Sequence, residues 1–473
     1  MRSLTTLVLS TSLAYAYPSV PGCWSKHKFA ESDILQRDVL VVGGGATGTF
    51  AAVKLKGAGQ TVAVVERDAQ LGGHVDTYYD PASGYPVDYG VQGYFANQQT
   101  KDFFAKFNVP LTSAASSPFP QKIADFSSGY IVPNASAPDL ATMQPLLTKY
   151  AGVLAQSFPY LAKGTYDLPD PVPEDLLLPF AAFAAKYDLL DTIPVVWTFA
   201  QGVGNLLEAT TLYVLQNFGL AHVLGLQAGF VVAQQGNQVV YDRAGSFLGA
   251  DAVLYNSKVI HLARGDDGVT AVVKTASGTK LVQAKKLLVT VPPTLGNLAK
   301  FDLDTTEKSL FGQWANVPYF IGVLAKSGLT DQTSFINVNL TSPDTLPRTP
   351  LVWRIETVGV PGYQTVKVIG ESSSKAAQRL VTDAVTRLDR SLQTDASAAE
   401  FVRWEEHDNL QLHVSAAELA QGFYKQLYSC QGKRSTWYTG NAWATDYSSL
   451  LWAFTEERIL PSLLGSLGSQ TPY

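Results

Sequence analysis

A short apolar run, an apolar helix and a second apolar run follow one another near the start of the chain. Residues 39–42 are all apolar, which is typical of a parallel strand buried on both faces. Residues 46–56 are largely apolar and rich in alanine, and glycines at 57 and 59 end this segment. A second apolar run occupies residues 62–65. The pattern predicts a β-α-β unit in a parallel sheet.

Three glycines with G-x-G-x-x-G spacing join the first strand to the helix. Gly43 permits a tight turn, Gly45 lets the backbone approach a pyrophosphate, and Gly48 lets the helix pack closely on the strand. Glu66, directly after the second strand, can accept hydrogen bonds from ribose hydroxyls. We therefore predict a dinucleotide site; the alternative is a glycine turn in an ordinary β-α-β unit. Phosphate would bind the free N–H groups at the helix start, beginning with Ala46 and Thr47.

The pattern changes to helical spacing between residues 96 and 250. Apolar residues recur at helical intervals in segments 141–155, 174–185 and 206–226. From 209 to 241 the chain carries no formal charge, a length that could suggest a membrane span. Polar residues and glycines interrupt this stretch, so we expect buried helices that line a chamber and no stable membrane insertion.

Strand-like patterns return after residue 250. We expect a strand over 254–262, with Val259 near its centre, and a β-meander after it. The chain closes with a strand from 437, a turn at Gly440 and a helix from about 446 or 448, for which Ser448 and Ser449 are N-cap candidates. A charged helix is expected over 376–392. The other expected strands are 269–274, 280–284, 286–292, 317–325, 351–357 and 365–370.

Two further motifs resemble a known family. Leu71-Gly72-Gly73 after Glu66 resembles the second glycine signature of the flavin amine oxidase group, and 87–90 resembles the turn that passes its flavin ring. The closest resemblance is to the fungal β-cyclopiazonate dehydrogenase-like flavoproteins. The match is good over 37–95 and again near 436–456. The resemblance implies FAD as cofactor and an oxidoreductase as the class of enzyme.

The resemblance also implies an α/β fold: a Rossmann-type FAD-binding domain with an inserted α+β substrate-binding domain. The FAD-binding domain would comprise 35–95, 241–299 and 426–473, and the substrate-binding domain 96–240 and 300–425. Val259 would hold the adenine through its backbone, and the helix near Ser448 would point its N-terminus at the flavin pyrimidine. Further FAD contacts would come from Arg67, Gly72, Gly73, Tyr89, Gly90, Val91, Gln92, Gly440, Asn441, Ser449 and Leu450.

His74 departs from the pattern of the family, which has arginine after the two glycines. A neutral imidazole can add to the 8α-methyl position of oxidised flavin and form a histidyl–flavin bond. Two alternatives stay open. His74 could donate a hydrogen bond to phosphate or ribityl oxygens, or it could be a structural histidine.

The substrate side of the site is less clearly marked in the sequence. Trp443, Tyr447 and Trp452 could form an aromatic wall for a planar or cationic substrate, although aromatic residues at such spacing are often plain core. The family's lysine beside flavin N5 should fall within 318–325, which contains none, and Lys326 reads as a solvated strand end. A second dinucleotide fingerprint is also absent from the sequence. We therefore expect the small-molecule substrate to be the electron donor and oxygen or another small acceptor to reoxidise the flavin.

Composition and the N-terminal segment indicate which ligands and which compartment to expect. A net charge of -5 without a basic cluster argues against nucleic-acid binding, and scattered histidines predict no metal site. Residues 1–16 read as a secretory signal peptide cut after Ala16, and Asn134 and Asn339 begin N-glycosylation sequons. Cys23 and Cys430 could form one disulfide, but spacing cannot decide this. The sequence does not indicate the oligomeric state.

Three functions fit these observations. The first is a secreted FAD-dependent oxidase or dehydrogenase that takes a hydride from a small nitrogenous or aromatic molecule, such as a secondary metabolite that undergoes oxidative cyclisation. The second is a flavin desaturase or prenyl-thioether-type oxidase, whose lipid-like substrate would lie along the uncharged stretch 209–241. The third is a flavin-binding protein without catalysis.

Overall fold

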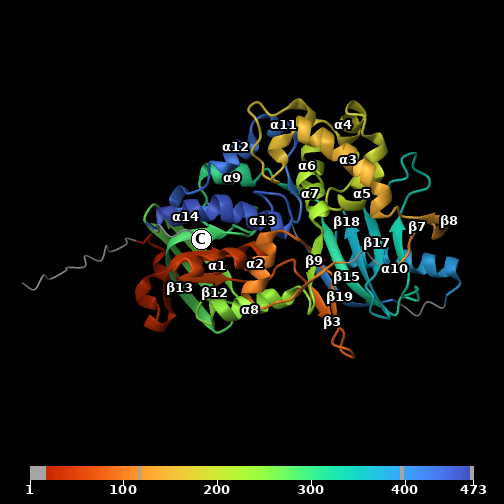
Figure 1. Ribbon diagram of the computed structural model, residues 1–473. Helices are drawn as coiled ribbons and strands as arrows, with labels where there is room; N and C mark the ends of the chain where they lie inside the picture. Colours follow the sequence, from red (N-terminus) through yellow and green to blue (C-terminus); the bar gives the residue numbers. More distant parts are fainter. Residues whose placement is uncertain (1–16, 115–118, 395–398, 408, 469–473) are drawn as a thin grey trace, which may run out of the picture.

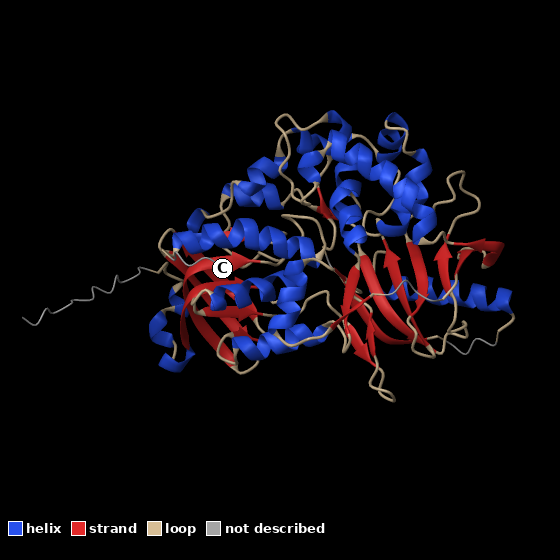
Figure 2. Cartoon of the chain, viewed as in Figure 1, coloured by secondary structure: helices blue, strands red, loops and turns tan. Residues whose placement is uncertain are grey.

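Two large β-sheets and a layer of helices make up the molecule (Figures 1 and 2). The computed structural model describes residues 17–114, 119–394, 399–407 and 409–468. The predicted signal peptide therefore lies outside the described residues. In Figure 1 one sheet lies at the left with α1 and α13, the other at the right, and helices α3 to α7 lie above the right-hand sheet.

The first sheet contains the predicted β-α-β unit. Its strand order is β10-β2-β1-β13-β12-β11, and β21 pairs with β13. Strands β10, β2, β1, β13 and β21 run parallel, whereas β11, β12 and β13 form an antiparallel meander. The strand bounds are β1 Ile34–Val42, β2 Val62–Val65, β10 Val253–Leu254, β11 Lys258–Gly265, β12 Gly268–Thr275, β13 Gly278–Val289 and β21 Thr436–Tyr438. Helices α1 (Ala46–Gly57), α8 (Gln238–Leu248) and α13 (Ser448–Phe454) accompany this sheet.

All strands of this sheet come from the three segments assigned to the FAD-binding domain, and the second sheet draws its strands from the two substrate-domain segments. The order of the second sheet is β19-β15-β18-β17-β16-β7-β8, and its neighbours are antiparallel except for β16 and β7. The long helix α10 (Ser374–Leu392) packs against it. The strands are β7 Gln121–Asp125, β8 Tyr130–Ser136, β15 Tyr319–Ala325, β16 Ser334–Asn337, β17 Leu351–Thr357, β18 Tyr363–Ile369 and β19 Glu400–Glu406.

The helical layer is more broken than the apolar pattern predicted. Segment 174–185 forms a 3-10 turn (Glu174–Leu177) and then α4, because Pro179 separates the two. Segment 206–226 forms two helices, α6 and α7, which the extended residues Phe218 and Gly219 separate. The helices of the layer are α3 Leu140–Ser157, α4 Phe180–Lys186, α5 Ile193–Phe199, α6 Thr211–Asn217 and α7 Leu220–Ala228.

Two strand predictions were wrong in detail. Val259 is the second residue of β11 rather than its centre, and a register shift follows it. Segments 280–284 and 286–289 belong to one strand, β13, because Lys285 does not interrupt the parallel pairing with β1, whereas residues 290–292 lie beyond its end. Lys326 lies beyond β15 in an exposed ion pair with Glu400, as a solvated strand end should.

Smaller elements connect these layers. Three two-stranded or three-stranded sheets lie between them: β3 with β4, β14 with β20, and β5-β9-β6. Their strands are β3 Thr77–Tyr79, β4 Pro86–Asp88, β5 Tyr94–Phe95, β6 Leu111–Ser113, β9 Phe230–Ala233, β14 Ala315–Asn316 and β20 Leu412–His413. The other helices are α2 Gln98–Lys106, α9 Thr305–Phe311, α11 Ala416–Ala420, α12 Phe423–Tyr428 and α14 Leu460–Ser466.

The structure also bears on the possible membrane span and on the two cysteines. Within the described ranges, every helix is too short or too polar to cross a bilayer. Cys23 is exposed, Cys430 is buried, and both are free thiols.

Candidate functional site

The glycine turn after β1 has the close contacts that its spacing predicted. Gly43 has a positive φ of 103°, which favours glycine. A Cβ on Gly48 would lie 2.0 Å from the Gly43 carbonyl oxygen, so only glycine lets α1 start this close to the strand. The first turn of α1, at Ala46 and Thr47, therefore lies directly above the end of β1.

The second glycine turn packs on the first. The Gly72 N–H donates to the Gly44 carbonyl at 2.9 Å, and Gly45 and Gly72 form a parallel bridge. A Cβ on Gly73 would lie 2.9 Å from the Gly45 Cα. Both glycines of the second turn have positive φ, 121° and 60°. Backbone from both turns thus forms one smooth surface at the start of α1, which fits an extended diphosphate.

Glu66 connects these turns. Its carboxylate accepts from the Gly44 N–H at 2.6 Å and from the Asp68 N–H at 2.9 Å. Burial raises the pKa of Glu66, although these two backbone donors oppose the shift. Arg67 follows with an exposed guanidinium that contacts Asp68. Glu66 therefore holds the glycine turn in shape, and its role in binding ribose stays a prediction.

A β-hairpin, β3–β4, leads from the Gly-Gly-His turn to the turn at 89–92. Tyr89 and Gly90 both donate from their backbone to the Asp76 carbonyl, and the Val91 N–H donates to the His74 carbonyl at 3.0 Å. A Cβ on Gly90 would lie 2.2 Å from that carbonyl. The two motifs of the family resemblance are thus bonded to each other.

His74 lies against a histidine that the sequence did not single out. The imidazoles of His74 and His407 stack with centroids 4.0 Å apart and planes at 13°. His407 Nε2 lies 2.9 Å from Asp76 Oδ2, and the Tyr319 ring lies 6.3 Å from the His407 ring. Burial lowers the pKa of His407 to about 3, so this ring is neutral. Burial raises the pKa of Asp76 to about 6.

Gln92, in the same turn, contacts a buried cluster of charge on the second sheet. The Lys367 ammonium donates to Gln92 Oε1 at 2.6 Å and lies 3.9 Å from Glu356 Oε2. Arg354 donates to Glu356 at 2.9 Å. Burial lowers the pKa of Lys367 to about 8, and Glu356 opposes this shift. Lys367 pairs with Ile321 of β15 in the sheet register. Strand β15 lies in the segment 318–325, where the family's lysine was expected and none occurs. A buried amine therefore approaches the flavin turn from the neighbouring strand.

The C-terminal motif reaches the same region. Gly440 has a φ of 115°, and a Cβ there would lie 3.1 Å from the Thr290 carbonyl at the end of β13. The side chain of Asn441 is already used, because its amide donates to the carbonyls of Asn409 and Leu410. A contact from the Asn441 side chain to a ribityl chain therefore has to compete with these bonds.

Helix α13 begins near the expected residue but with a different cap. Tyr447 is the N-cap and makes no side-chain cap, and Ser448 is the first helical residue. The Ser449 hydroxyl instead accepts from the Phe95 N–H and contacts the Thr100 hydroxyl. The N-cap prediction for both serines was wrong, because the Ser449 side chain joins α13 to β5 and α2. Leu450, half-buried, follows on the same helix.

The three residues of the predicted aromatic wall do not form one surface, because each packs against different neighbours. Trp452 is fully buried between Phe50 and Tyr94, and its indole N–H donates to the Ala46 carbonyl at 3.1 Å. Trp443 is fully buried against Tyr438. Both tryptophans thus have the environment of core residues. Tyr447 is half-buried and stacks on Phe95 at 4.9 Å.

Two titratable residues, the half-buried Asp446 and the buried His222, lie beside Tyr447. Burial raises the pKa of Asp446 to about 7. Burial lowers the pKa of His222 to about 3, and this histidine is satisfied: Nδ1 accepts from the Gly219 N–H, and Nε2 lies 3.3 Å from the Thr445 hydroxyl. Asp446 is therefore a candidate proton acceptor, whereas His222 is structural.

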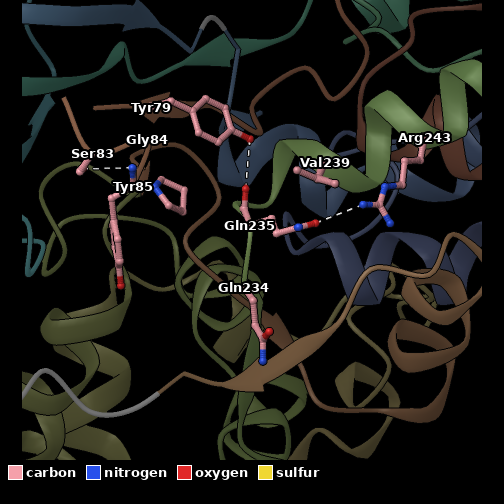
Figure 3. A pocket seen from close by; sticks show the side chains of 9 residues that line it. Tyr79, Ser83, Gly84, Tyr85, Gln234, Gln235, Val239 and Arg243 are labelled. Carbon is pink, nitrogen blue, oxygen red and sulfur yellow. Dashed lines mark hydrogen bonds between the residues drawn. The ribbon is translucent and has the colours of Figure 1, made fainter. Parts of the chain in front are cut away.

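An open pocket of about 550 Å³ lies on the other side of α8 (Figure 3). Gln238 points toward the Gly72 turn, whereas Val239 and Arg243 line the pocket. Arg243 donates to Gln235, and the Tyr79 hydroxyl donates to the Gln235 carbonyl. These groups bond to one another, and the pocket is separate from the predicted flavin site.

Comparison with known proteins identifies the family. The model of the NAD(P)-binding Rossmann-like domain matches residues 41–107. The chain is 36% identical to β-cyclopiazonate dehydrogenase of Aspergillus oryzae over 90% of its own length and 92% of that protein. It is also 36% identical to the FAD-dependent oxidoreductase oblC of Cochliobolus heterostrophus over 99% of this chain and 100% of the other. The chain belongs to this family of FAD-dependent oxidoreductases. The predicted family, enzyme class and FAD cofactor are confirmed.

Solved structures show the same fold for this FAD-dependent oxidoreductase. A fatty acid isomerase from P. acnes has a TM-score of 0.72 at 17% identity, covering 90% of this chain and 98% of the other. Putrescine oxidase bound to putrescine has a TM-score of 0.63 at 16% identity, covering 92% and 99%. The predicted fold class is thus confirmed. The paired glycine turns, in which backbone closes the Cβ positions of Gly48 and Gly73, fit the diphosphate of FAD.

The sequence did not reveal several residues that this site brings together. Glycine spacing indicated Gly43, Gly45, Gly48, Gly72 and Gly73, but the hydrogen bond from Gly44 to Glu66 had no separate signal. Asp76 lies two residues after His74 and could have been noted from the motif. Lys367 and His407 lie about 300 residues from the glycine turns, and only the tertiary structure places them there. In the described ranges, no group of three potential metal ligands occurs.

Proposed function

We propose that the protein is an FAD-dependent oxidase or dehydrogenase that takes a hydride from a small nitrogenous or aromatic substrate. Its relationship to β-cyclopiazonate dehydrogenase over most of both chains carries this proposal. That relative is named for a dehydrogenation. For this protein we infer an oxidation of a secondary metabolite, such as an oxidative cyclisation. When bound, FAD supplies the hydride acceptor and passes the electrons to oxygen or another small acceptor.

The residues around the site would provide charge and orientation. Lys367, with its pKa near 8, is mainly an ammonium at neutral pH and lies bonded to Gln92 in the turn beside the ring site. A buried cation there favours the gain of negative charge that accompanies reduction. Asp446, with a pKa near 7, can accept a proton from a substrate nitrogen. Tyr447 supplies a partly exposed aromatic face next to it.

We also propose that His74 carries FAD covalently. The imidazole follows the glycine turn that packs on the start of α1, so it lies along the expected path of the cofactor. Its stacking partner, His407, is a neutral ring, so it does not repel the positive charge that a flavin-bonded imidazole can carry. Acid precipitation of the holoenzyme tests the link: flavin that remains in the pellet supports it, and complete release contradicts it.

Secretion remains part of the proposal. It rests on the leader pattern of residues 1–16 and on the two sequons. Asn134 is exposed on β8, where a glycan could be attached. N-terminal sequencing of protein from the culture medium should begin at Tyr17; an intact leader on cell-bound protein would contradict secretion.

Anaerobic reduction tests the catalytic proposal. The purified holoenzyme should have a flavin spectrum, and nitrogenous aromatic donors should bleach it, with colour and peroxide appearing when air is admitted. Bleaching by isoprenoid thioethers alone would favour the lipid-like alternative. A flavin spectrum that no donor bleaches would favour a non-catalytic flavin-binding protein.

A further inference from the structure

His407 belongs to the substrate-binding half of the molecule but touches the residue proposed to hold FAD. It directly follows β19, and its backbone N–H donates to the Tyr319 carbonyl on β15. Its ring lies almost parallel to that of His74, with 4.0 Å between centroids. The second sheet thus supplies a flat surface for the His74 side chain.

Asp76 fixes the orientation of this surface. Its Oδ2 lies 2.9 Å from His407 Nε2, while its backbone carbonyl accepts from the N–H groups of Tyr89 and Gly90. The carboxylate itself is packed closely, because a Cβ on Gly90 would lie 2.9 Å from Oδ2. The rotation of the His407 ring is therefore set by a residue of the same turn that contains His74.

Tyr319 is a second aromatic neighbour of His407. Its ring lies 6.3 Å from that of His407 at 21°, and its hydroxyl donates to Gln201 at 2.8 Å. Tyr319 and His407 are both almost completely buried. The His407 ring that faces His74 is thus itself held by Asp76 and buried beside Tyr319.

We infer that His407, oriented by Asp76, is a positioning residue that holds the His74 imidazole in the orientation needed to bond FAD. This inference rests on the proposed covalent link. A nucleophile held near the geometry of bond formation reacts much faster than a freely rotating one, because the loss of rotational freedom has already occurred. His407 itself forms no bond to the cofactor.

The bonding step balances with oxygen as oxidant. A bond forms between an imidazole nitrogen of His74 and the 8α-methyl carbon, and one methyl C–H bond and the imidazole N–H bond break. Two protons leave to water, and two electrons enter the ring system of the cofactor. Dioxygen, the acceptor of the proposed function, takes the two electrons and two protons to give hydrogen peroxide and the oxidised, bonded cofactor.

Four variants separate the parts of this arrangement. His74→Ala removes the nucleophile, His407→Ala removes the stacking ring, His407→Phe keeps a flat ring without a nitrogen, and Asp76→Asn weakens the bond to Nε2. His413→Phe is the matched control, since this half-buried histidine packs on Tyr213 in the helical region.

Each apoprotein is mixed with FAD in air, and portions are acid-precipitated over time. The covalent fraction is read from flavin fluorescence on a denaturing gel and from intact mass. We expect His74→Ala to bind FAD without bonding it, and His407→Ala to bond it at least tenfold more slowly while its dissociation constant for FAD changes less than about twofold. His407→Phe should recover part of the rate, Asp76→Asn should lie between Ala and wild type, and His413→Phe should match wild type.

The outcomes distinguish the two proposals. If wild type releases all FAD, the covalent link is wrong. If wild type bonds FAD at His74 and His407→Ala does so at the same rate, the link is right and the positioning role is wrong. If peptide mapping finds the flavin on His407, the assignment of the two histidines is overturned.

Discussion

Two buried basic residues of this protein are partnered in opposite ways. Arg264 on β11 is 4% exposed and Lys367 on β18 is 5% exposed, so burial does not distinguish them. Arg264 donates to Asp302 at 2.9 Å, to both oxygens of Glu307 at 2.8 and 2.6 Å, and to the Tyr438 hydroxyl at 2.9 Å. Lys367 has Gln92 at 2.6 Å and a carboxylate only at 3.9 Å.

The difference in partners is the reason why we assign a structural role to Arg264 and propose a functional one for Lys367. The network around Arg264 joins β11, α9 and β21 and uses the donors of the guanidinium in a bidentate pair. The Lys367 cluster is less complete: among the described residues, Arg354 Nε is a buried donor without a partner. A buried charge that its surroundings do not fully compensate is typical of an active site.

Disrupting the hydrogen-bond network of Arg264 should have the largest effect on stability. Replacement of Arg264 by Met leaves the Glu307 carboxylate buried without its cation, so the free energy of unfolding should fall by about 3–5 kcal/mol. Urea unfolding followed by far-UV circular dichroism measures this. A loss below about 1 kcal/mol would show that the network contributes little.

Replacement of Lys367 by Met should instead affect chemistry. The rate of flavin reduction by substrate should fall about 100-fold, because the buried cation beside Gln92 is lost. The free energy of unfolding at pH 7 should not decrease. Stopped-flow reduction measures the rate, and Lys326→Met, which removes an exposed ammonium just beyond β15, is the control. Equal reduction rates in wild type and Lys367→Met would contradict the functional role.

The pH dependence of stability should sharpen the contrast. The pKa of Lys367 is lowered from 10.5 to about 8, so the unfolded chain binds more protons than the folded one between these values. Wild type should therefore gain stability relative to Lys367→Met as the pH rises from about 8 to 10.5, and the difference should be constant below 8. Unfolding at several pH values tests this; a gain that occurs on acidification would contradict it.

The smallest effect should come from an exposed pair. Lys425 contacts Asp170, and both side chains are largely exposed. Replacement of Lys425 by Met should change the free energy of unfolding by less than about 0.5 kcal/mol, because solvent and salt screen the pair. A loss comparable to that of Arg264→Met would show that burial is not what decides these effects.

The contrast between these clusters also shows how far the sequence leads. The strands at 62–65 and 351–357 were predicted to the residue. The first is a continuous apolar run and the second is rich in apolar residues broken by Arg354 and Glu356, and both patterns are local signals. The glycine turns were predicted because close backbone contacts require glycine. The split of 206–226 into two helices was missed, although Gly219, whose Cβ would lie 2.0 Å from the Leu215 carbonyl, is a local signal for it. The capping of α13 was missed because the Ser449 hydroxyl bonds to Phe95 and Thr100, which only the tertiary structure brings close.

The residues that contact His74 and Gln92 could not be predicted from local sequence pattern either. His74 and Gln92 were noted within their motifs, but His407 and Lys367 reach them from strands far along the chain. Neither residue lies in a periodic segment that marks it as functional. Burial and partner geometry, which only the fold defines, give both their altered pKa values.

The order of strands in the first sheet has a consequence for biosynthesis. Strand β13 lies between β1, made near the start of the chain, and β21, made near its end, so the sheet has a long contact order. During translation residues 287–289 of β13 remain unpaired on one edge until residues 436–438 emerge. We expect the cofactor-binding half to complete its folding only after synthesis, with a long period in which chaperones or FAD itself can protect the unfinished sheet.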